Sequence, residues 1–179
     1  IFEASFAMSR ELGEGAGIAE VLRWYERTGG RLEDFDALKP FIGLYKVPDL
    51  AAPTVEAVEI GTHCLAAKSL CVTDSDSVNH YIRSLGTASR DEISFSYRRT
   101  FTAATYKLFQ RNMLVDFPGA GPKYSLKYAS LLLPVIGANR EKLIMNFSIY
   151  LATEPEADTS AHTMSNSGAT AERYSLLLR

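Results

Sequence analysis

The spacing of apolar residues from position 93 onward limits the possible folds of this chain more than any other feature of its sequence. Five of these residues recur at steps of four or three: Ile93, Tyr97, Phe101, Ala104 and Leu108. Such spacing places side chains on one face of an α-helix. Because successive residues lie about 100° apart around a helix, Arg99 points away from that face, and Arg98 and Lys107 flank it. The pattern predicts an amphipathic helix with cationic sides.

Positive charge is concentrated in and around this predicted helix. Positions 90–142 hold nine of the 19 Lys and Arg residues but only four of the 21 Asp and Glu residues. A turn rich in Gly and Pro, residues 118–122, follows the helix, and Lys123 and Lys127 come directly after it. The net charge of −2 argues against a surface that coats nucleic acid everywhere. It still allows one local basic groove.

Most other segments also favour helices. A stripe of apolar residues at 18–25 stops at Gly29-Gly30, and Asp74 to Ser77 can cap a helix over 78–85. Pro53-Thr54 opens another expected helix, which runs to Leu70.

Two later segments complete the predicted set of helices. Residues 124–133 are expected to form a helix closed by Pro134. Residues 139–152 are expected to be helical, although their later half also fits a strand. We therefore expect a mainly α fold, a single-core helical bundle with an extended C-terminal arm.

The domain organisation follows from length and composition. A chain of 179 residues with 46% hydrophobic residues can bury one sizeable core. Residues 1–152 are expected to be the helical core domain. Residues 153–179, rich in Ser, Thr, Ala, Glu and Asp, are expected to be a flexible arm that ends in an apolar tail. The sequence contains no uncharged apolar run of the roughly 18 residues that a transmembrane helix needs.

The sequence carries no enzyme signature. It lacks the GxGxxG, GxxxxGK[ST], HExxH and GxSxG motifs, and its three histidines are scattered. Cys64 and Cys71 are more readily explained as free thiols than as a disulfide, which favours a reducing compartment. We therefore expect no catalytic residues, no metal and no cofactor. A small enzyme built around His63 or His80 beside a carboxylate remains a remote alternative.

The concentration of positive charge at positions 90–142 has two possible explanations. It can be a solvated helix face, or its arginines can donate bidentate hydrogen bonds to phosphate groups. Four tyrosines interleave with the cations and can either stack on bases or belong to the core: Tyr97, Tyr106, Tyr124 and Tyr128. A phosphodiester backbone needs spaced cations and a groove but no base-reading groups. This arrangement favours a nucleic-acid backbone as the partner.

The order of these segments resembles the coat proteins of flexuous filamentous plant viruses of the potexvirus, potyvirus and trichovirus types. The likeness covers roughly residues 45–150. It rests on a Cys- and Ser-bearing segment at 54–69, a short helix at 77–84, an Arg helix at 96–105 and a closing segment at 127–133.

The resemblance implies an RNA pocket made by a Ser, an Arg and an Asp around a flipped-out nucleotide. Ser69 matches the Ser, and Arg98 matches the Arg, with Arg99 as the second choice. Leu132 stands where the family has the Asp. The resemblance also implies terminal arms that link neighbouring subunits into a helical polymer, and a location in the virion and the host cytoplasm.

The function expected from the sequence is that of a viral coat or nucleocapsid protein that polymerises around single-stranded RNA. Binding would involve the phosphate backbone with little sequence specificity. The residues expected to bind RNA are Ser69, Arg98, Arg99, Lys107, Lys123 and Lys127. The alternative is a soluble helical adaptor that docks on a protein partner through its apolar tail.

Overall fold

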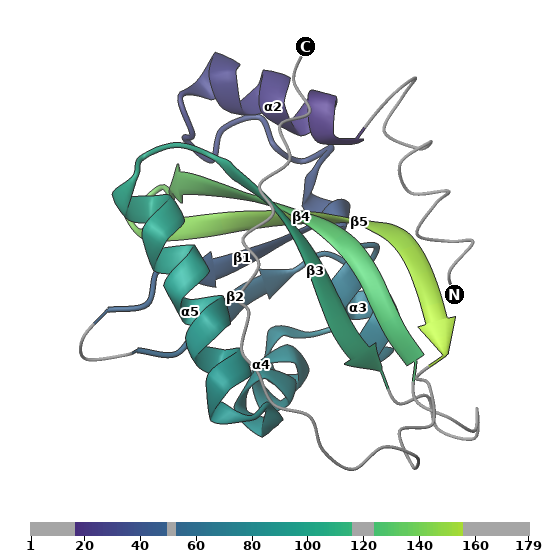
Figure 1. The fold of residues 1–179 in the computed structure, drawn as a ribbon. Helices are drawn as coiled ribbons and strands as arrows, with labels where there is room; N and C mark the ends of the chain where they lie inside the picture. Colours follow the sequence, from purple (N-terminus) through teal and green to yellow (C-terminus); the bar gives the residue numbers. More distant parts are fainter. Residues whose placement is uncertain (1–16, 50–52, 116–123, 156–179) are drawn as a thin grey trace.

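The computed structural model describes residues 17–49, 53–115 and 124–155. These residues build a five-stranded antiparallel sheet with helices on both faces (Figure 1). Among these residues one α-helix and one short 3-10 helix precede the sheet, and three α-helices stand between its second and third strands. In chain order the elements are α2 (Gly17–Thr28), the 3-10 helix η1 (Lys39–Phe41), β1 (Ile42–Lys46), β2 (Glu56–Ile60), α3 (Leu65–Leu70), α4 (Ser75–Ser84), α5 (Thr87–Thr102), β3 (Lys107–Val115), β4 (Tyr124–Ile136) and β5 (Lys142–Pro155).

The sheet joins early and late parts of the chain. Its strand order is β2-β1-β5-β4-β3, so β1 lies between β2 and the last strand, β5. Ile42 pairs with Phe147, and Lys46 pairs with Leu143. β4 and β5 form a long hairpin whose pairing runs to Ile136 opposite Lys142. Because the central strands come from distant positions, the described residues form one structural unit.

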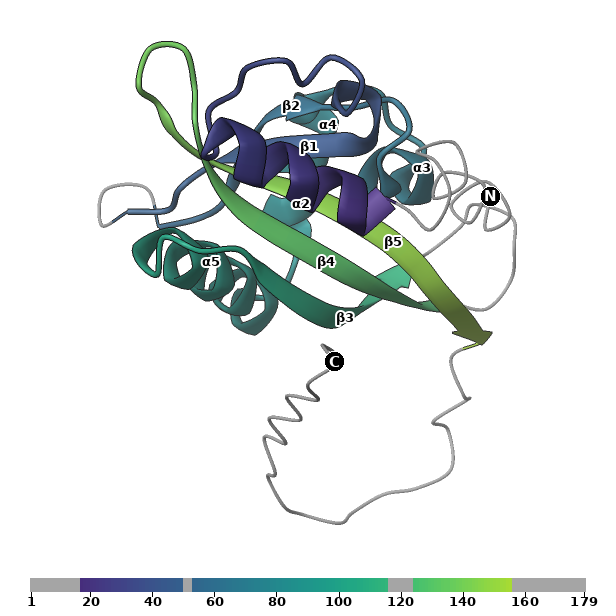
Figure 2. The same cartoon turned by 90° about the horizontal axis from the view of Figure 1, so that it is seen from above.

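The first described helix, α2, lies across one face of the sheet (Figure 2). It buries Val21 and Trp24, and the indole Nε1 of Trp24 donates a hydrogen bond to the carbonyl of Glu33 at 2.9 Å. The helix ends at Gly29 and Gly30, whose φ values of +62° and +76° suit glycine far better than other residues. The helix and its glycine stop, both predicted from the sequence, are confirmed.

The helices α3, α4 and α5 cover the other face. α4 begins at a side-chain cap, because Asp74 Oδ1 accepts a hydrogen bond from the amide of Ser77 at 2.8 Å. The cap predicted from the sequence is therefore confirmed. In α5 the buried residues are Ser94, Ser96, Tyr97 and Thr100, which face the sheet. The helical layer and the sheet enclose the second of the two large cores.

The central strands are buried on both faces. In β4, Leu131 and Leu133 pack toward α2, whereas Leu132 packs toward the other helices. In β5, Ile144 lies with the three-helix layer, and Phe147 lies with α2. A strand covered on both sides needs apolar residues at consecutive positions rather than in alternation.

The expectation of a mainly α, single-core helical bundle is wrong. Residues 54–60, predicted as the start of a helix, include the edge strand β2, and α3 begins only at Leu65. Residues 124–133, also predicted as a helix, lie in β4. The continuous run of apolar residues in β4 resembles a buried helix because both of its faces are covered. Residues 139–152 were expected to be helical, with a later half that also fits a strand; β5 begins at Lys142, so most of the earlier half is strand as well.

The central helix is shorter than its periodicity predicts. α5 ends at Thr102, Ala104 has a φ of +50°, and Leu108 belongs to β3, where it is 56% exposed. The predicted 1–152 helical domain is therefore a mixed α and β unit over its described residues. Residues 153–155 of the predicted arm continue β5, and the rest of the arm lies outside the described residues.

Candidate functional site

The predicted RNA-binding residues do not form one cluster. Arg98 and Arg99 are exposed on α5, and Lys107 is half-buried at the start of β3. Lys107 pairs with Leu132 on β4, and Lys127 lies five residues further along that strand. The two lysines are therefore separated by roughly 17 Å along the strand direction. Ser69 is only 3% exposed, so its side chain is not available to an RNA strand on the surface. Lys123 lies outside the described residues.

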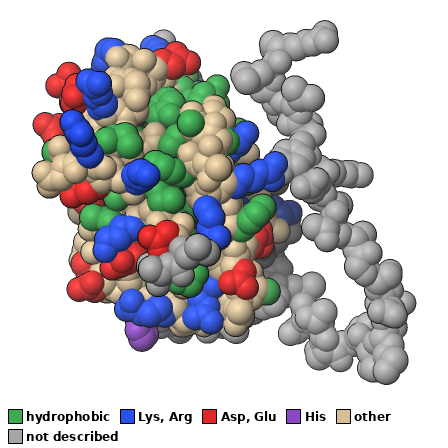
Figure 3. Space-filling view, turned by 90° about the vertical axis from the view of Figure 1, so that its left-hand side faces the viewer, with side chains coloured by type: hydrophobic (Ala, Val, Ile, Leu, Met, Phe, Trp, Pro, Cys, Tyr) green, Lys and Arg blue, Asp and Glu red, His purple; other side chains and the backbone are tan. Residues whose placement is uncertain are grey.

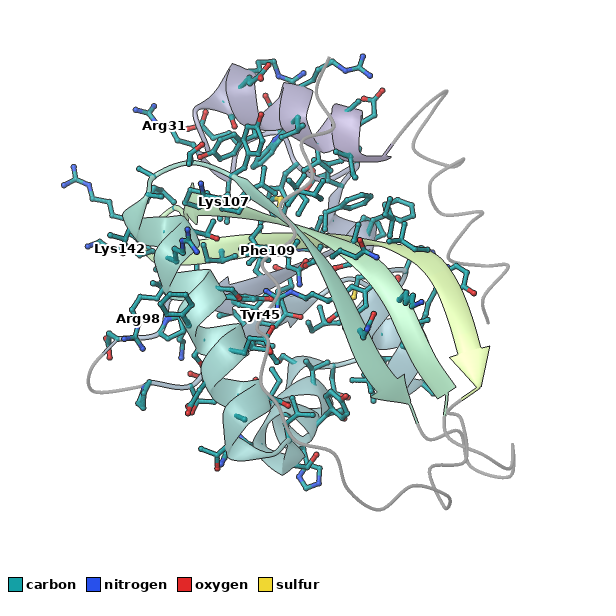
Figure 4. All side chains as sticks on the ribbon, viewed as in Figure 1. Arg31, Tyr45, Arg98, Lys107, Phe109 and Lys142 are labelled. Atoms are coloured by element: carbon teal, nitrogen blue, oxygen red, sulfur yellow. The ribbon has the colours of Figure 1, made fainter. Side chains whose placement is uncertain are left out.

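Two predicted cations share one side of the molecule with three that the sequence analysis did not assign. We call this set the basic end. Figure 4 shows Arg31, Arg98, Lys107 and Lys142 on the same side of the fold, each from a different segment. The turn between β4 and β5 adds Arg140. The basic end therefore consists of Arg31, Arg98, Lys107, Arg140 and Lys142.

Backbone pairing and packing bring these segments together. Arg31 forms an isolated parallel bridge with Ile136, and Ile136 pairs with Lys142 across the hairpin. The Nζ of Lys142 lies 5.9 Å from the centre of the Phe101 ring. Phe101 is one helical turn after Arg98 on α5, so the loop after α2, the hairpin and α5 form one continuous surface.

Acidic side chains share this face with the basic end (Figure 3): Glu33 and Asp34 follow Arg31 closely, and Glu141 stands between Arg140 and Lys142. Among the described residues, none of its five cations takes part in a salt bridge. Glu141 is the acid within the same turn, and its carboxylate accepts a 3.4 Å hydrogen bond from Asn139. Figure 3 looks onto this side and shows Lys and Arg side chains interspersed with hydrophobic ones, with acidic side chains also present. Unpaired cations at a surface can take up an anionic partner without first breaking an ion pair.

An exposed aromatic residue extends this surface along α5. Phe95 is 63% exposed, although a Phe side chain normally gains from burial. It precedes Arg98 by three residues and Arg99 by four, so all three share the outer face of the helix. Asp91 lies one turn before Phe95 on the same face, and it marks the acidic limit of the surface.

The tyrosines considered as stacking partners have other surroundings. Tyr97 is buried against the sheet, where its hydroxyl accepts a hydrogen bond from Asn146 Nδ2 at 2.9 Å. Tyr106 makes an edge-to-face contact with Tyr25, with ring centres 6.4 Å apart. Tyr128 is half-buried and lines an internal pocket. The side chain of Tyr124 lies outside the described residues.

The segments that carry the coat-protein resemblance have mixed structure. Residues 77–84 are helical, as is the Arg segment up to Thr102, whereas residues 127–133 are strand. Residues 54–69 change from strand to helix. Leu132, at the position of the family's Asp, is completely buried in the core. In this fold that position cannot contribute a group to an exposed RNA site.

The described residues contain no group of three or more metal-ligating side chains. His63 and His80 are both exposed, and neither lines the internal pocket. Within the described ranges, no helix combines the length and the apolarity needed to cross a bilayer.

Comparisons of this chain with protein-family models, with curated proteins and with solved structures find no match. The function of this chain is therefore inferred from the geometry of its own residues.

Proposed function

We propose that this protein binds the backbone of single-stranded RNA, without sequence specificity and without catalysis, along the outer face of α5 and across the basic end. The observation that carries the proposal is the exposed Phe95 one helical turn before Arg98. An aromatic ring can stack on any base, and an adjacent guanidinium can fork onto the neighbouring phosphate. This pairing of ring and cation is the minimal element of a non-specific single-strand site.

The continuity of the surface supports a strand rather than an isolated anion. From Arg98 the surface passes over Phe101 to Lys142, and from there to Arg31 through the backbone contacts of Ile136. A flexible strand can follow cations that come from several segments, and such binding needs only spaced positive charge. An exposed ring also favours a single strand, since bases within a duplex are already stacked.

Fluorescence anisotropy with a labelled 20-nucleotide uridine RNA tests the proposal. The double variant Arg98→Ala, Lys142→Ala should weaken binding and reduce the slope of log K against log salt by about 1.4, because each neutralised phosphate on a single strand contributes about 0.7. The matched control is Arg23→Ala, Arg83→Ala, which removes the same charge from exposed positions on α2 and α4. An equal loss of affinity in both double variants contradicts the proposed site.

Phe95→Ala tests the stacking component separately. Base stacking on an aromatic side chain contributes about 1–3 kcal/mol, so the affinity should fall roughly tenfold or more with the salt slope unchanged. Phe95→Tyr keeps a ring for stacking and should bind almost like the wild type. If Phe95→Ala binds normally, the aromatic part of the proposal fails.

Assembly into a viral coat remains a prediction. The C-terminal segment expected to link neighbouring subunits lies mostly outside the described residues, as does the apolar tail of the adaptor alternative. Electron microscopy of the protein with and without RNA distinguishes these roles. RNA-dependent filaments favour the coat role, whereas dispersed particles that bind RNA favour a non-polymerising RNA-binding protein.

A further inference from the structure

A pocket of about 780 Å³ lies between the three-helix layer and the sheet, on the opposite side of α5 from the proposed RNA surface. Ligand pockets in proteins commonly measure roughly 300–1,000 Å³. Figure 4 shows Tyr45 and Phe109 in the region between α5 and the sheet. The helical side of the pocket is mainly apolar and includes Leu70, Val78, Ile82, Leu85 and Ile93. These side chains suit the hydrocarbon part of a ligand.

Arg111 provides a cation inside this pocket. It is half-buried on β3, and its guanidinium lies 4.9 Å from the centre of the Phe109 ring and donates a hydrogen bond to Ser96 Oγ. Among the described residues it has no salt bridge. A half-buried guanidinium with a single side-chain hydrogen bond retains donors for an anion.

Three tyrosines line the same pocket, and one of them, Tyr128, stands beside the guanidinium. Tyr128 stands directly opposite Arg111 in the antiparallel pairing of β3 with β4. Tyr45 packs edge-to-face on Tyr97 with ring centres 5.3 Å apart, and all three tyrosines line the pocket. Burial raises the pKa of each of the three tyrosines, so their hydroxyls keep their protons at neutral pH and can donate hydrogen bonds.

The hydroxyls of Tyr45 and Tyr128 have no hydrogen-bond partner among the described residues. No fully buried side-chain nitrogen or oxygen in this part of the chain lacks a partner. These two hydroxyls must therefore reach accessible space, and the pocket that both residues line provides it. Two free donors and a guanidinium thus line a cavity whose helical side is mainly apolar.

The floor of the pocket is a satisfied polar network. Ser130 Oγ donates to Asn146 Oδ1 at 2.7 Å, and Ser148 Oγ donates to the same oxygen at 2.9 Å. Because these groups already bond to one another, they fix the shape of the floor rather than demand a ligand. Glu92 also lines the pocket, is exposed and forms no salt bridge with Arg111.

We propose that this pocket binds a small amphipathic anion, with a carboxylate on Arg111 and the hydroxyl of Tyr128 and a hydrocarbon body against the helices. The carboxylate gives Arg111 its missing counter-ion and accepts a hydrogen bond from Tyr128. The hydrocarbon body fills the apolar side of the cavity. The proposal does not depend on RNA binding, which involves the outer face of α5.

Isothermal titration with three matched ten-carbon probes tests the chemistry of the ligand. Decanoate should bind more tightly than decanol, and decylammonium should bind most weakly. A hydrogen bond to a charged group contributes enough that Arg111→Met should weaken decanoate roughly tenfold to a hundredfold while changing decanol little. Arg83→Met, an exposed arginine on α4, is the control and should leave decanoate unchanged.

Three further variants test the location of the site. Tyr128→Phe removes one hydroxyl and should weaken the binding of decanoate several-fold. If Arg111→Met does not fold, this variant tests the same anion site. Glu92→Gln removes the acid that faces the pocket and should strengthen decanoate. Ala66→Phe places a ring in the cavity and should reduce the affinity for both decanoate and decanol. Absence of decanoate binding, equal affinity for decanoate and decanol, or wild-type decanoate binding in both Arg111→Met and Tyr128→Phe overturns the proposal.

Discussion

Asn79 should hold the edge strand β2 to the helical layer. Its Oδ1 accepts a hydrogen bond from the amide of Ala57 at 2.7 Å, and its Nδ2 donates to the carbonyl of Ala57 at 3.0 Å. Both residues are buried, with Asn79 6% exposed and Ala57 4% exposed. The side chain thus satisfies both backbone groups that an edge strand would otherwise leave unpaired.

Asn79→Ala should therefore destabilise the protein strongly. It leaves one buried N–H and one buried C=O without partners, and each unsatisfied group costs about 1–3 kcal/mol. The expected loss is about 2–5 kcal/mol, a large share of the stability of a domain of this size. The neighbouring variant His80→Ala changes an exposed side chain on the same helix and should cost less than about 0.5 kcal/mol.

Urea denaturation measures this loss, with far-ultraviolet circular dichroism and tryptophan fluorescence as two probes. The single tryptophan, Trp24, lies on the opposite face of the sheet, so coincident midpoints show that the whole unit unfolds together. If Asn79→Ala unfolds within about 0.5 kcal/mol of the wild type, β2 is not held by this side chain. The docking of α4 on the sheet edge would then be wrong.

Three further predictions concern the core and the turn after α2. Stability should fall as pH rises above about 10, because burial raises the pKa of Tyr97 in the folded state, so that Tyr97 loses its proton more readily in the unfolded chain. In denaturation curves measured at alkaline pH, Tyr97→Phe should reduce this dependence of stability on pH. Gly30→Ala should lower the melting temperature more than Gly29→Ala, since both have positive φ but only a Cβ at position 30 would come within 2.9 Å of the Pro134 carbonyl oxygen. Phe147→Ala should cost about 3–5 kcal/mol in urea denaturation, because this completely buried ring leaves a cavity between the sheet and α2.

Some local signals in the sequence predicted their part of the fold correctly. The cap at Asp74 and the glycines after α2 act within a few residues, so they could be recognised without tertiary information. β4 could not be recognised in this way. Its apolar run fits a helix and a doubly covered strand equally well, and only the partner strands decide between them.

Pro134 illustrates the same limit. It was expected to end a helix, yet it lies within β4 beyond the end of β3, whose pairing stops at Leu132. The carbonyl of Pro134 points toward Gly30 and away from β5. In an antiparallel strand the nitrogen of a residue points the same way as its carbonyl, so the nitrogen of Pro134 also points away from β5. Its missing N–H therefore costs no bond to β5. The sequence alone does not indicate that the pairing of β3 with β4 stops two residues before Pro134.

The candidate site divides in the same way. Arg98 and Arg99 could be found from local charge and helical spacing, and Lys107 from local charge alone. Arg31 and Lys142 could not, because Arg31 joins the site only through its bridge to the distant Ile136, and Lys142 only through its contact with Phe101 on α5. Phe95 was detectable in principle, since it lies off the apolar face defined by Ile93 and Tyr97, which marks it as an exposed ring.

Photo-cross-linking of a 4-thiouridine-substituted 20-nucleotide RNA, with the linked peptides identified by mass spectrometry, tests the RNA site most directly. We predict cross-links within residues 95–102 and 140–142, and their loss in the Arg98→Ala, Lys142→Ala variant. Cross-links confined to other surfaces, such as β2 or α2, or cross-links that persist unchanged in that variant, would contradict the proposed site.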